Sequence, residues 1–243
     1  MKKIILAALM LTGMLSAHAD VAISEATYGI INIPIIAGMN AIGISLLPMP
    51  GVDNAVENIV LPEGLTATTQ QGTADKLYVF NGDAGYNIYW LDENNGNPVW
   101  NKDGVSHVAS PGDGMWINAQ APGTVYEIGL VAGAETIIPL KGGNNFIANP
   151  YPADLNLANV TWTGVAAANK NTMRKADLLR TWNAATEEYT TFFYVENDMD
   201  PTGWYHANTY QLAPEIPAGE GFWFFSRNAT LDASITITKP NTL

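Results

Sequence analysis

The chain has 243 residues, no cysteine, and a formal net charge of −12 at pH 7, with 23 acidic against 11 basic side chains. Without cysteine it can form no disulfide, thiolate nucleophile or cysteine-ligated metal site. The acidic balance argues against nucleic acid or an anionic membrane as a partner, because affinity for phosphate groups comes from Lys and Arg side chains. Charged residues make up only 14% of the chain. The surface is therefore expected to consist largely of Asn, Thr, Ser, Gly and aromatic side chains.

Residues 1–19 have the pattern of a secretory signal peptide. Lys2 and Lys3 precede an apolar run, 4–15, which is too short to span a bilayer and is followed by the small-residue signature Ala17-His18-Ala19. Cleavage after Ala19 would begin the mature chain at Asp20. The sequence therefore predicts a bacterial protein exported to the periplasm, the cell surface or the medium, with no transmembrane segment.

Two stretches of about 100 residues match one another along the remaining chain. With a constant offset of 105, the second stretch repeats the first at Ile33-Pro34 and Ile138-Pro139, Gly38 and Gly143, Asn40 and Asn145, and Ile42 and Ile147. Further downstream Asp75 corresponds to Asp177, and both are predicted to be caps or turn acceptors that lead into a strand. We therefore predict two tandem homologous β-modules, at 20–132 and 133–243.

Each predicted module contains many short strands. Residues 28–36 are almost wholly apolar and β-branched, which predicts a buried strand that bends at Pro34. A turn at 38–40 and a strand at 41–47 predict an opening hairpin, repeated at 135–140 and 145–148. Other strands are predicted at 76–81, 86–91, 115–117, 124–130, 178–183, 188–195, 222–225 and 234–238. Polar turns separate them, and one short helix is predicted within 166–177. This pattern is typical of an all-β sandwich or barrel.

Three motifs of the second module suggest a relationship. They are Asn149-Pro150-Tyr151-Pro152, the aromatic-Asn strand end Trp182-Asn183, and the run Ile216-Pro217-Ala218-Gly219-Glu220-Gly221-Phe222. With them the chain resembles a duplicated β-module of bacterial exported and surface proteins that carries "GNPYP" and "IxxGxGF" motifs, and it is similar to families of uncharacterised secreted proteins. Ala148 stands where that pattern has Gly. The resemblance implies a surface, matrix or accessory role and brings no catalytic residue with it.

Candidate catalytic groups are few. His107 and His206 do not superpose in the repeat alignment, and neither belongs to a nucleophile or zinc motif. Asp113 and Glu220 occupy equivalent positions between two glycines, so one interpretation is a pair of carboxyls for glycan hydrolysis. The simpler interpretation is a turn residue that bonds its own backbone. No catalytic residue is predicted.

Two polar loops suggest a calcium site. Asp92 and Asn94 in the first loop, and Asp198 and Asp200 in the second, cluster the oxygen donors that calcium prefers, without the spacing of an EF-hand. Solvated turns are the alternative interpretation. No other cofactor is indicated.

Aromatic residues are numerous, with seven Trp and ten Tyr in the chain. Their ring faces can stack on the C–H groups of a pyranose while Asn or Asp bonds the hydroxyls. The candidates that flank loops, and are therefore predicted to bind a glycan, are Trp90, Trp100, Trp204 and Tyr205. Those that lie in apolar runs, and are expected in the core, are Trp116, Trp182 and Trp223. The alternative is that all of these rings fill the core of a β-sandwich.

These observations favour a non-catalytic exported protein with a structural or interaction role at the cell surface or in a matrix. Its partners would be other surface proteins, or further copies of itself joined through an exposed strand edge. One alternative is a carbohydrate-binding, lectin-like protein that uses the loop aromatics. The other is a glycan hydrolase built on Asp113 and Glu220.

Overall fold

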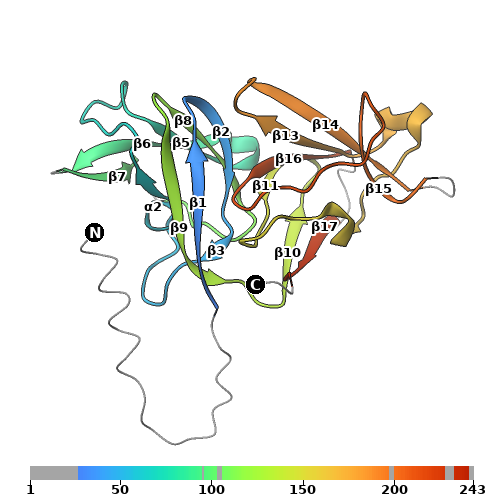
Figure 1. Cartoon of the computed structure of the whole chain (residues 1–243), viewed down its shortest axis with the longest axis horizontal. Coiled ribbons are helices and arrows are strands. Elements are labelled where there is room, and N and C mark those ends of the chain that lie inside the picture. The colour runs from blue at the N-terminus through green and yellow to red at the C-terminus, as the bar shows by residue number, and fades with distance from the viewer. Residues whose placement is uncertain (1–26, 95, 103–105, 197–199, 228–232, 241–243) are drawn as a thin grey trace, which may run out of the picture.

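The computed structural model describes residues 27–94, 96–102, 106–196, 200–227 and 233–240. Its strands form four antiparallel sheets, two from each half of the chain (Figure 1), so the predicted all-β class is confirmed. Across these ranges, no helix is both long enough and apolar enough to cross a membrane. The predicted signal peptide lies outside the described residues.

The first half of the chain builds two sheets. One has the order β1-β9-β3, with β4 also paired to β9, and the other has the order β2-β8-β5-β6-β7. The strands are β1 (Tyr28–Ile35), β2 (Gly38–Gly43), β3 (Leu46–Leu47), β4 (Leu61–Glu63), β5 (Lys76–Phe80), β6 (Tyr86–Asn94), β7 (Asn97–Asn101), β8 (Gly114–Ala119) and β9 (Gly123–Val131). A short helix, α2 (Val56–Ile59), and a 3-10 turn, η2 (Gly82–Ala84), lie between them.

The second half builds sheets of order β10-β17-β12 and β11-β16-β13-β14-β15. Its elements are β10 (Glu135–Leu140), β11 (Gly143–Ala148), η3 (Leu157–Asn159), β12 (Val160–Thr163), η4 (Lys170–Lys175), β13 (Leu178–Asn183), β14 (Glu188–Val195), β15 (Gly203–His206), β16 (Gly221–Ser226) and β17 (Ala233–Thr238). When β3 is left out, the strand orders of the two halves correspond one to one. The order β1-β9-β4 matches β10-β17-β12, and β2-β8-β5-β6-β7 matches β11-β16-β13-β14-β15.

Each half has its own apolar core between its two sheets. In the first half, Ile31 and Ile33 of β1 belong to one buried cluster with Leu77 of β5. In the second half, Ile235 of β17 and Phe224 of β16 share a cluster in the same way. Because both sheets of a half contribute inward-facing side chains to one core, each half is a β-sandwich.

The predicted opening hairpin is wrong. β1 pairs with β9, whereas β2 pairs with β8 in the other sheet. The turn at Gly38 therefore moves the chain from one sheet to the other. Asn40 Oδ1 accepts the amide of Ile36 at 3.0 Å, and its Nδ2 donates to the carbonyls of Ile36 and Gly38 at 2.8 and 2.9 Å. These bonds satisfy backbone groups that a hairpin partner would otherwise satisfy, and Asn145 repeats them in the second half.

The helix predicted within 166–177 is shorter than expected. Only the 3-10 segment η4 forms, and the side chain of Asn169 caps it. The residues before it are drawn into extended backbone, because the amide of Ala166 donates to the Asp177 carboxylate at 2.9 Å and that of Ala168 to the Tyr194 carbonyl at 3.0 Å. Tertiary hydrogen bonds thus override the helix propensity of the alanines.

Asp75 and Asp177 are the acceptors that the repeat predicts. Asp75 accepts the backbone amides of Thr66 and Gln120, both at 2.7 Å. Asp177 accepts two amides at the equivalent places, at 2.9 and 2.7 Å. Both residues are 0% exposed. Each acid therefore ties the end of a sheet to the loop that precedes its own strand.

Candidate functional site at the junction of the two halves

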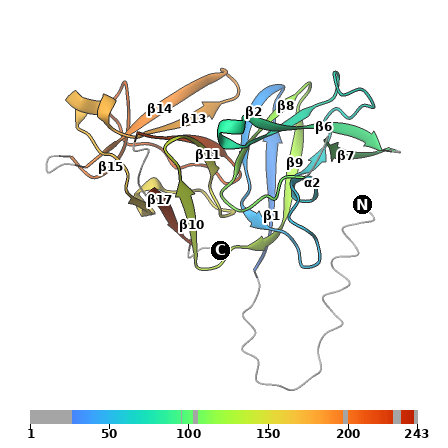
Figure 2. The same cartoon turned by 180° about the vertical axis from the view of Figure 1, so that it is seen from behind.

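The two five-stranded sheets contact one another through β2 and β8 of the first half and β11 and β16 of the second (Figures 1 and 2). One isolated backbone bridge joins Ile42 to Glu220 and a second joins Asp113 to Ile147. Ile42 corresponds to Ile147 in the repeat alignment, and Asp113 corresponds to Glu220. Each bridge is therefore the counterpart of the other, and a pseudo-two-fold axis relates the two halves at this junction.

Close approach of two backbones explains the Gly-acid-Gly turns. A Cβ atom on Gly114 would lie 2.8 Å from the carbonyl oxygen of Ile147, and one on Gly221 would overlap the carbonyl oxygen of Ile42. Only a residue without a side chain fits at either place. The glycines of this motif are thus required by the junction, whatever the acid between them does.

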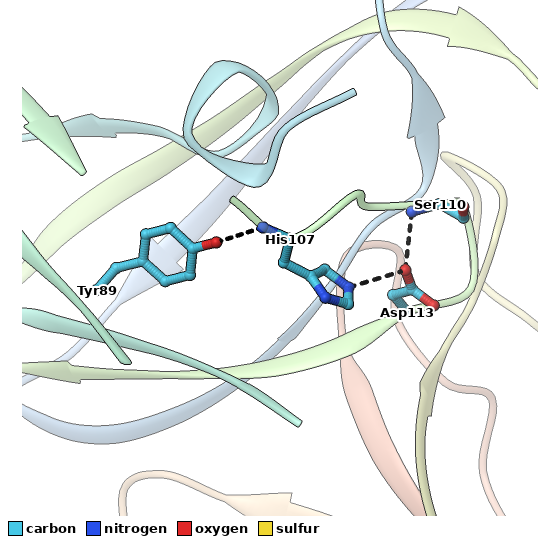
Figure 3. Close-up of polar contacts among 4 residues, drawn as sticks. All are labelled: Tyr89, His107, Ser110 and Asp113. Carbon is cyan, nitrogen blue, oxygen red and sulfur yellow. Dashed lines mark hydrogen bonds and ion pairs between the residues drawn. The ribbon is translucent and has the colours of Figure 1, made fainter. Parts of the chain in front are cut away.

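The two acids have different surroundings. Asp113 Oδ2 accepts the amide of Ser110 at 2.8 Å and lies 3.8 Å from His107 Nε2 (Figure 3). Pro217 stands where the first half has Ser110, and proline has no amide hydrogen. Among the described residues, none hydrogen-bonds the Glu220 carboxyl. Burial without compensating partners raises the pKa of Glu220 to about 7.

A hydrolytic triad consists of the same residue types as Ser110, His107 and Asp113. The contacts among these three residues differ from those of a triad. A triad requires the serine hydroxyl on one ring nitrogen of the histidine and the acid on the other. Here Ser110 contacts Asp113 through its backbone amide, and the amide of His107 donates to the Tyr89 hydroxyl at 2.7 Å (Figure 3). The cluster holds the backbone of the 107–113 loop in place.

The predicted glycan-binding aromatics are mostly buried. Trp100, Trp204 and Tyr205 are only 4%, 1% and 6% exposed, and Trp90 is half-buried in β6. Trp100 Nε1 donates to the Val60 carbonyl at 2.8 Å. The reason is that β7 and β15 continue the five-stranded sheets, so residues that flank loops in the sequence pack against the interior. No ring face of Trp100, Trp204 or Tyr205 is free for a sugar, which corrects the prediction for these three.

The proposed calcium ligands make other contacts. Asp92 Oδ2 accepts a hydrogen bond from the facing strand β7 at 3.3 Å, and Asp200 Oδ2 accepts the Tyr210 hydroxyl at 2.8 Å. Asn94 ends β6, so the predicted first loop is in fact a β6–β7 hairpin. Asp198 lies outside the described residues. Within the described ranges, no group of three or more His, Asp or Glu side chains could hold a metal ion.

An open aromatic hollow lies beside the junction, on the sheet faces opposite the two cores. Its volume is about 490 Å³, and both halves of the chain line it. Tyr86 and Tyr189 are 41% and 47% exposed there, whereas Trp116 is buried at its base. The residues that line this aromatic hollow are Met39, Tyr78, Tyr86, Trp116, Trp182 and Tyr189.

Ring contacts cross the junction beside the aromatic hollow, among them two edge-to-face pairs. The ring centroids of Trp116 and Trp182 are 5.5 Å apart at an interplanar angle of 88°, and those of Phe80 and Trp223 are 4.9 Å apart at 79°. The two pairs are counterparts in the repeat. Trp182 adds a hydrogen bond from its Nε1 to the Met39 carbonyl at 2.7 Å, which Phe80 has no group to make. Edge-to-face rings and this bond fix the wall of the hollow.

Trp116 and Trp182 were expected in the core, and their place in the lining of this hollow was not predicted. The signal was present in the alternation of the aromatic strands. Met115 and Ile117 face the first core, and Trp116 between them must therefore face the other way. What the sequence could not show is that the second half supplies Trp182 and Tyr189 to the same place.

Comparison with family models, curated proteins and solved structures gives no match for this chain.

Proposed function

We propose that this chain is a non-catalytic exported binding protein and that its aromatic hollow binds carbohydrate. The observation that carries the proposal is an open concavity lined by five aromatic side chains from both halves. Its volume of about 490 Å³ falls within the range of roughly 300–1,000 Å³ common for small-molecule sites. The pattern of residues 1–19 supports export.

The chemistry of the lining residues suits a sugar. Tyr and Trp offer a broad apolar face together with a polar tip, and a pyranose likewise has apolar C–H faces edged by hydroxyl groups. Three of the lining residues, Tyr78, Tyr86 and Tyr189, carry a phenol hydroxyl. The partly exposed rings of Tyr86 and Tyr189 supply stacking surface without any change in the core. In a surface or matrix protein, such a site would attach the protein to a glycan.

Calorimetric titration with a panel of oligosaccharides tests the proposal. Tyr86→Ala and Tyr189→Ala should each weaken binding by about tenfold or more, because loss of a stacked ring removes on the order of 1–2 kcal/mol. Tyr28→Ala is the matched control, since Tyr28 is 51% exposed but lies on β1. Absence of saccharide binding, or an equal loss in the control, would reject the aromatic hollow as a glycan site.

A second candidate, self-association through strand edges, is favoured by β1. This strand ends its sheet in the described strand order, and Ile30 on it is 69% exposed. β10 has the same place in the second half, with Ile137 61% exposed. Exposed apolar edge strands can pair with a further chain. Sedimentation should then show oligomers that grow with concentration and disappear in Ile30→Lys; a monomer at every concentration would reject this role.

A further inference from the structure

A second, smaller hollow borders the aromatic hollow. It has a volume of about 220 Å³ and lies between β1, β2 and the turn that precedes β16, with Pro34, Asn40, Trp182, Pro217 and Glu220 among its lining residues. Trp182 lines both hollows. The two hollows therefore share one lining residue, and we refer to the smaller one as the Glu220 groove.

Glu220 is the one charged side chain among the residues that line this groove. Its counterpart Asp113 has the Ser110 amide and the His107 ring beside it. Pro217 removes the equivalent amide from Glu220, and none of the described residues supplies a hydrogen bond in its place. A half-buried carboxylate without a partner is unfavourable, because desolvation is not offset.

We propose that the Glu220 groove binds the positively charged amino group of an amino sugar whose pyranose rings stack in the aromatic hollow. This inference rests on the proposed carbohydrate-binding function and names the class of sugar. An ammonium group would give Glu220 the charge-assisted hydrogen bonds that it lacks. The neighbouring Trp182 face attracts cations through its ring quadrupole. The net charge of −12 also concentrates cationic ligands around the protein.

Two ligands that differ only at the amine test the proposal. A tetramer of β-1,4-linked glucosamine and the same tetramer fully N-acetylated are titrated into the protein by calorimetry at neutral pH and low salt. The free amine should bind at least tenfold more tightly than the acetamide. The preference should shrink as salt is added, because salt screens the attraction between charges.

Variants assign the preference to one carboxyl. Glu220→Gln should remove the preference for the amine, so that the variant binds the two tetramers with similar affinity. Glu220→Asp, which keeps the charge on a shorter side chain, should retain part of it. Asp113→Asn is the matched control and should keep the full preference, since its carboxyl already has partners. Unfolding midpoints verify that each variant is folded.

The outcomes separate this inference from the function on which it rests. If the wild type binds both tetramers equally, or if Glu220→Gln keeps the preference, the amine site is wrong while carbohydrate binding stands. If neither tetramer binds, the amine site is rejected, and the oligosaccharide panel then decides the carbohydrate proposal separately.

Discussion

The two halves of the molecule share the residues that bond their own backbone and differ in the residues that face the junction. Asn40 and Asn145 make the same corner bonds, and Asp75 and Asp177 accept equivalent amides. By contrast, Ser110 is replaced by Pro217, and the acids that follow them have different partners. The comparison suggests that the shared hydrogen bonds from side chains to the backbone determine the fold of each half, whereas differences at the junction determine what each half can bind. A common origin of the halves stays a prediction, which the matching strand orders support.

A buried acid separates the two halves most clearly. Glu127 is 0% exposed, its Oε2 accepts the amide of Ser45 at 2.8 Å, and its Oε1 has no partner. The second half has Ile237 at the same register position. It also has Pro150 at the position of Ser45. At these two positions the second half therefore has neither the carboxyl group of Glu127 nor the backbone amide that donates to it. The polar pair of the first half is thus replaced as a unit.

The largest expected effect tests the hydrogen bonds to the backbone that both halves share. Asp75→Ala and Asp177→Ala should each lower the free energy of unfolding by about 3 kcal/mol or more, because two backbone amides lose their acceptor and leaving one buried donor unsatisfied costs about 1–3 kcal/mol. Chemical denaturation measures the loss. Asp→Asn at each position, which keeps one acceptor oxygen, should be milder. A loss below about 0.5 kcal/mol in one half would show that the two acids are not equivalent.

The next effect concerns the buried acid of the first half. Burial raises the pKa of Glu127 to about 8 from its ordinary value of 4.5. Between these values the folded protein holds a proton that the unfolded chain has released, so stability should fall as pH rises from about 5 to about 8. The slope approaches about 1.4 kcal/mol per pH unit for one group.

Glu127→Gln should flatten this slope relative to the wild type, because the amide keeps an acceptor for Ser45 and does not titrate. Urea unfolding at several pH values measures both proteins. The net charge of −12 acts on both alike, so the difference between them isolates Glu127. Parallel pH profiles would show that this group stays ionised in the fold.

A smaller effect concerns the tightest contact of the junction. A Cβ atom on Gly43 would overlap the Cβ of Ala148, which is its counterpart in the repeat. Gly43→Ala should therefore destabilise by about 1–3 kcal/mol through overpacking. Adding Ala148→Gly should restore much of that loss, since the swapped pair again contains one methyl group. A double-mutant cycle by thermal unfolding measures the coupling, and additive losses would contradict the contact.

The smallest expected effect removes one hydrogen bond. Trp182→Phe makes the second half resemble the first, which has Phe80, and deletes the bond to the Met39 carbonyl. The free energy of unfolding should fall by about 1 kcal/mol from this bond, with some added loss of ring area. Phe80→Leu, which keeps an apolar side chain but loses the ring, is the companion variant on the other side. No change in Trp182→Phe would mean that the indole bond contributes nothing to the junction.

The sequence allowed the strands to be predicted but not their partners. The apolar, β-branched run at 28–36 located β1, yet the long-range pairing of β1 with β9 and of β2 with β8 decides that the two strands join different sheets. The matched positions Asp113 and Glu220 were visible in the repeat. Their different surroundings depend on His107 and Pro217, whose spatial relation appears only after folding. Trp100 seemed exposed because it flanks a loop, whereas the β6–β7 hairpin carries it into the core.

The contact between Gly43 and Ala148 also bears on how such a junction can evolve. Residues on a two-fold axis meet their own copies in a homodimer, so a pair of identical subunits would need alanine twice, which clashes, or glycine twice, which leaves a gap. A single covalent chain escapes this restriction because each side of the axis is encoded separately. Linkage therefore lets the interface use unequal partners, and every later substitution on one side can be selected without its mirror image.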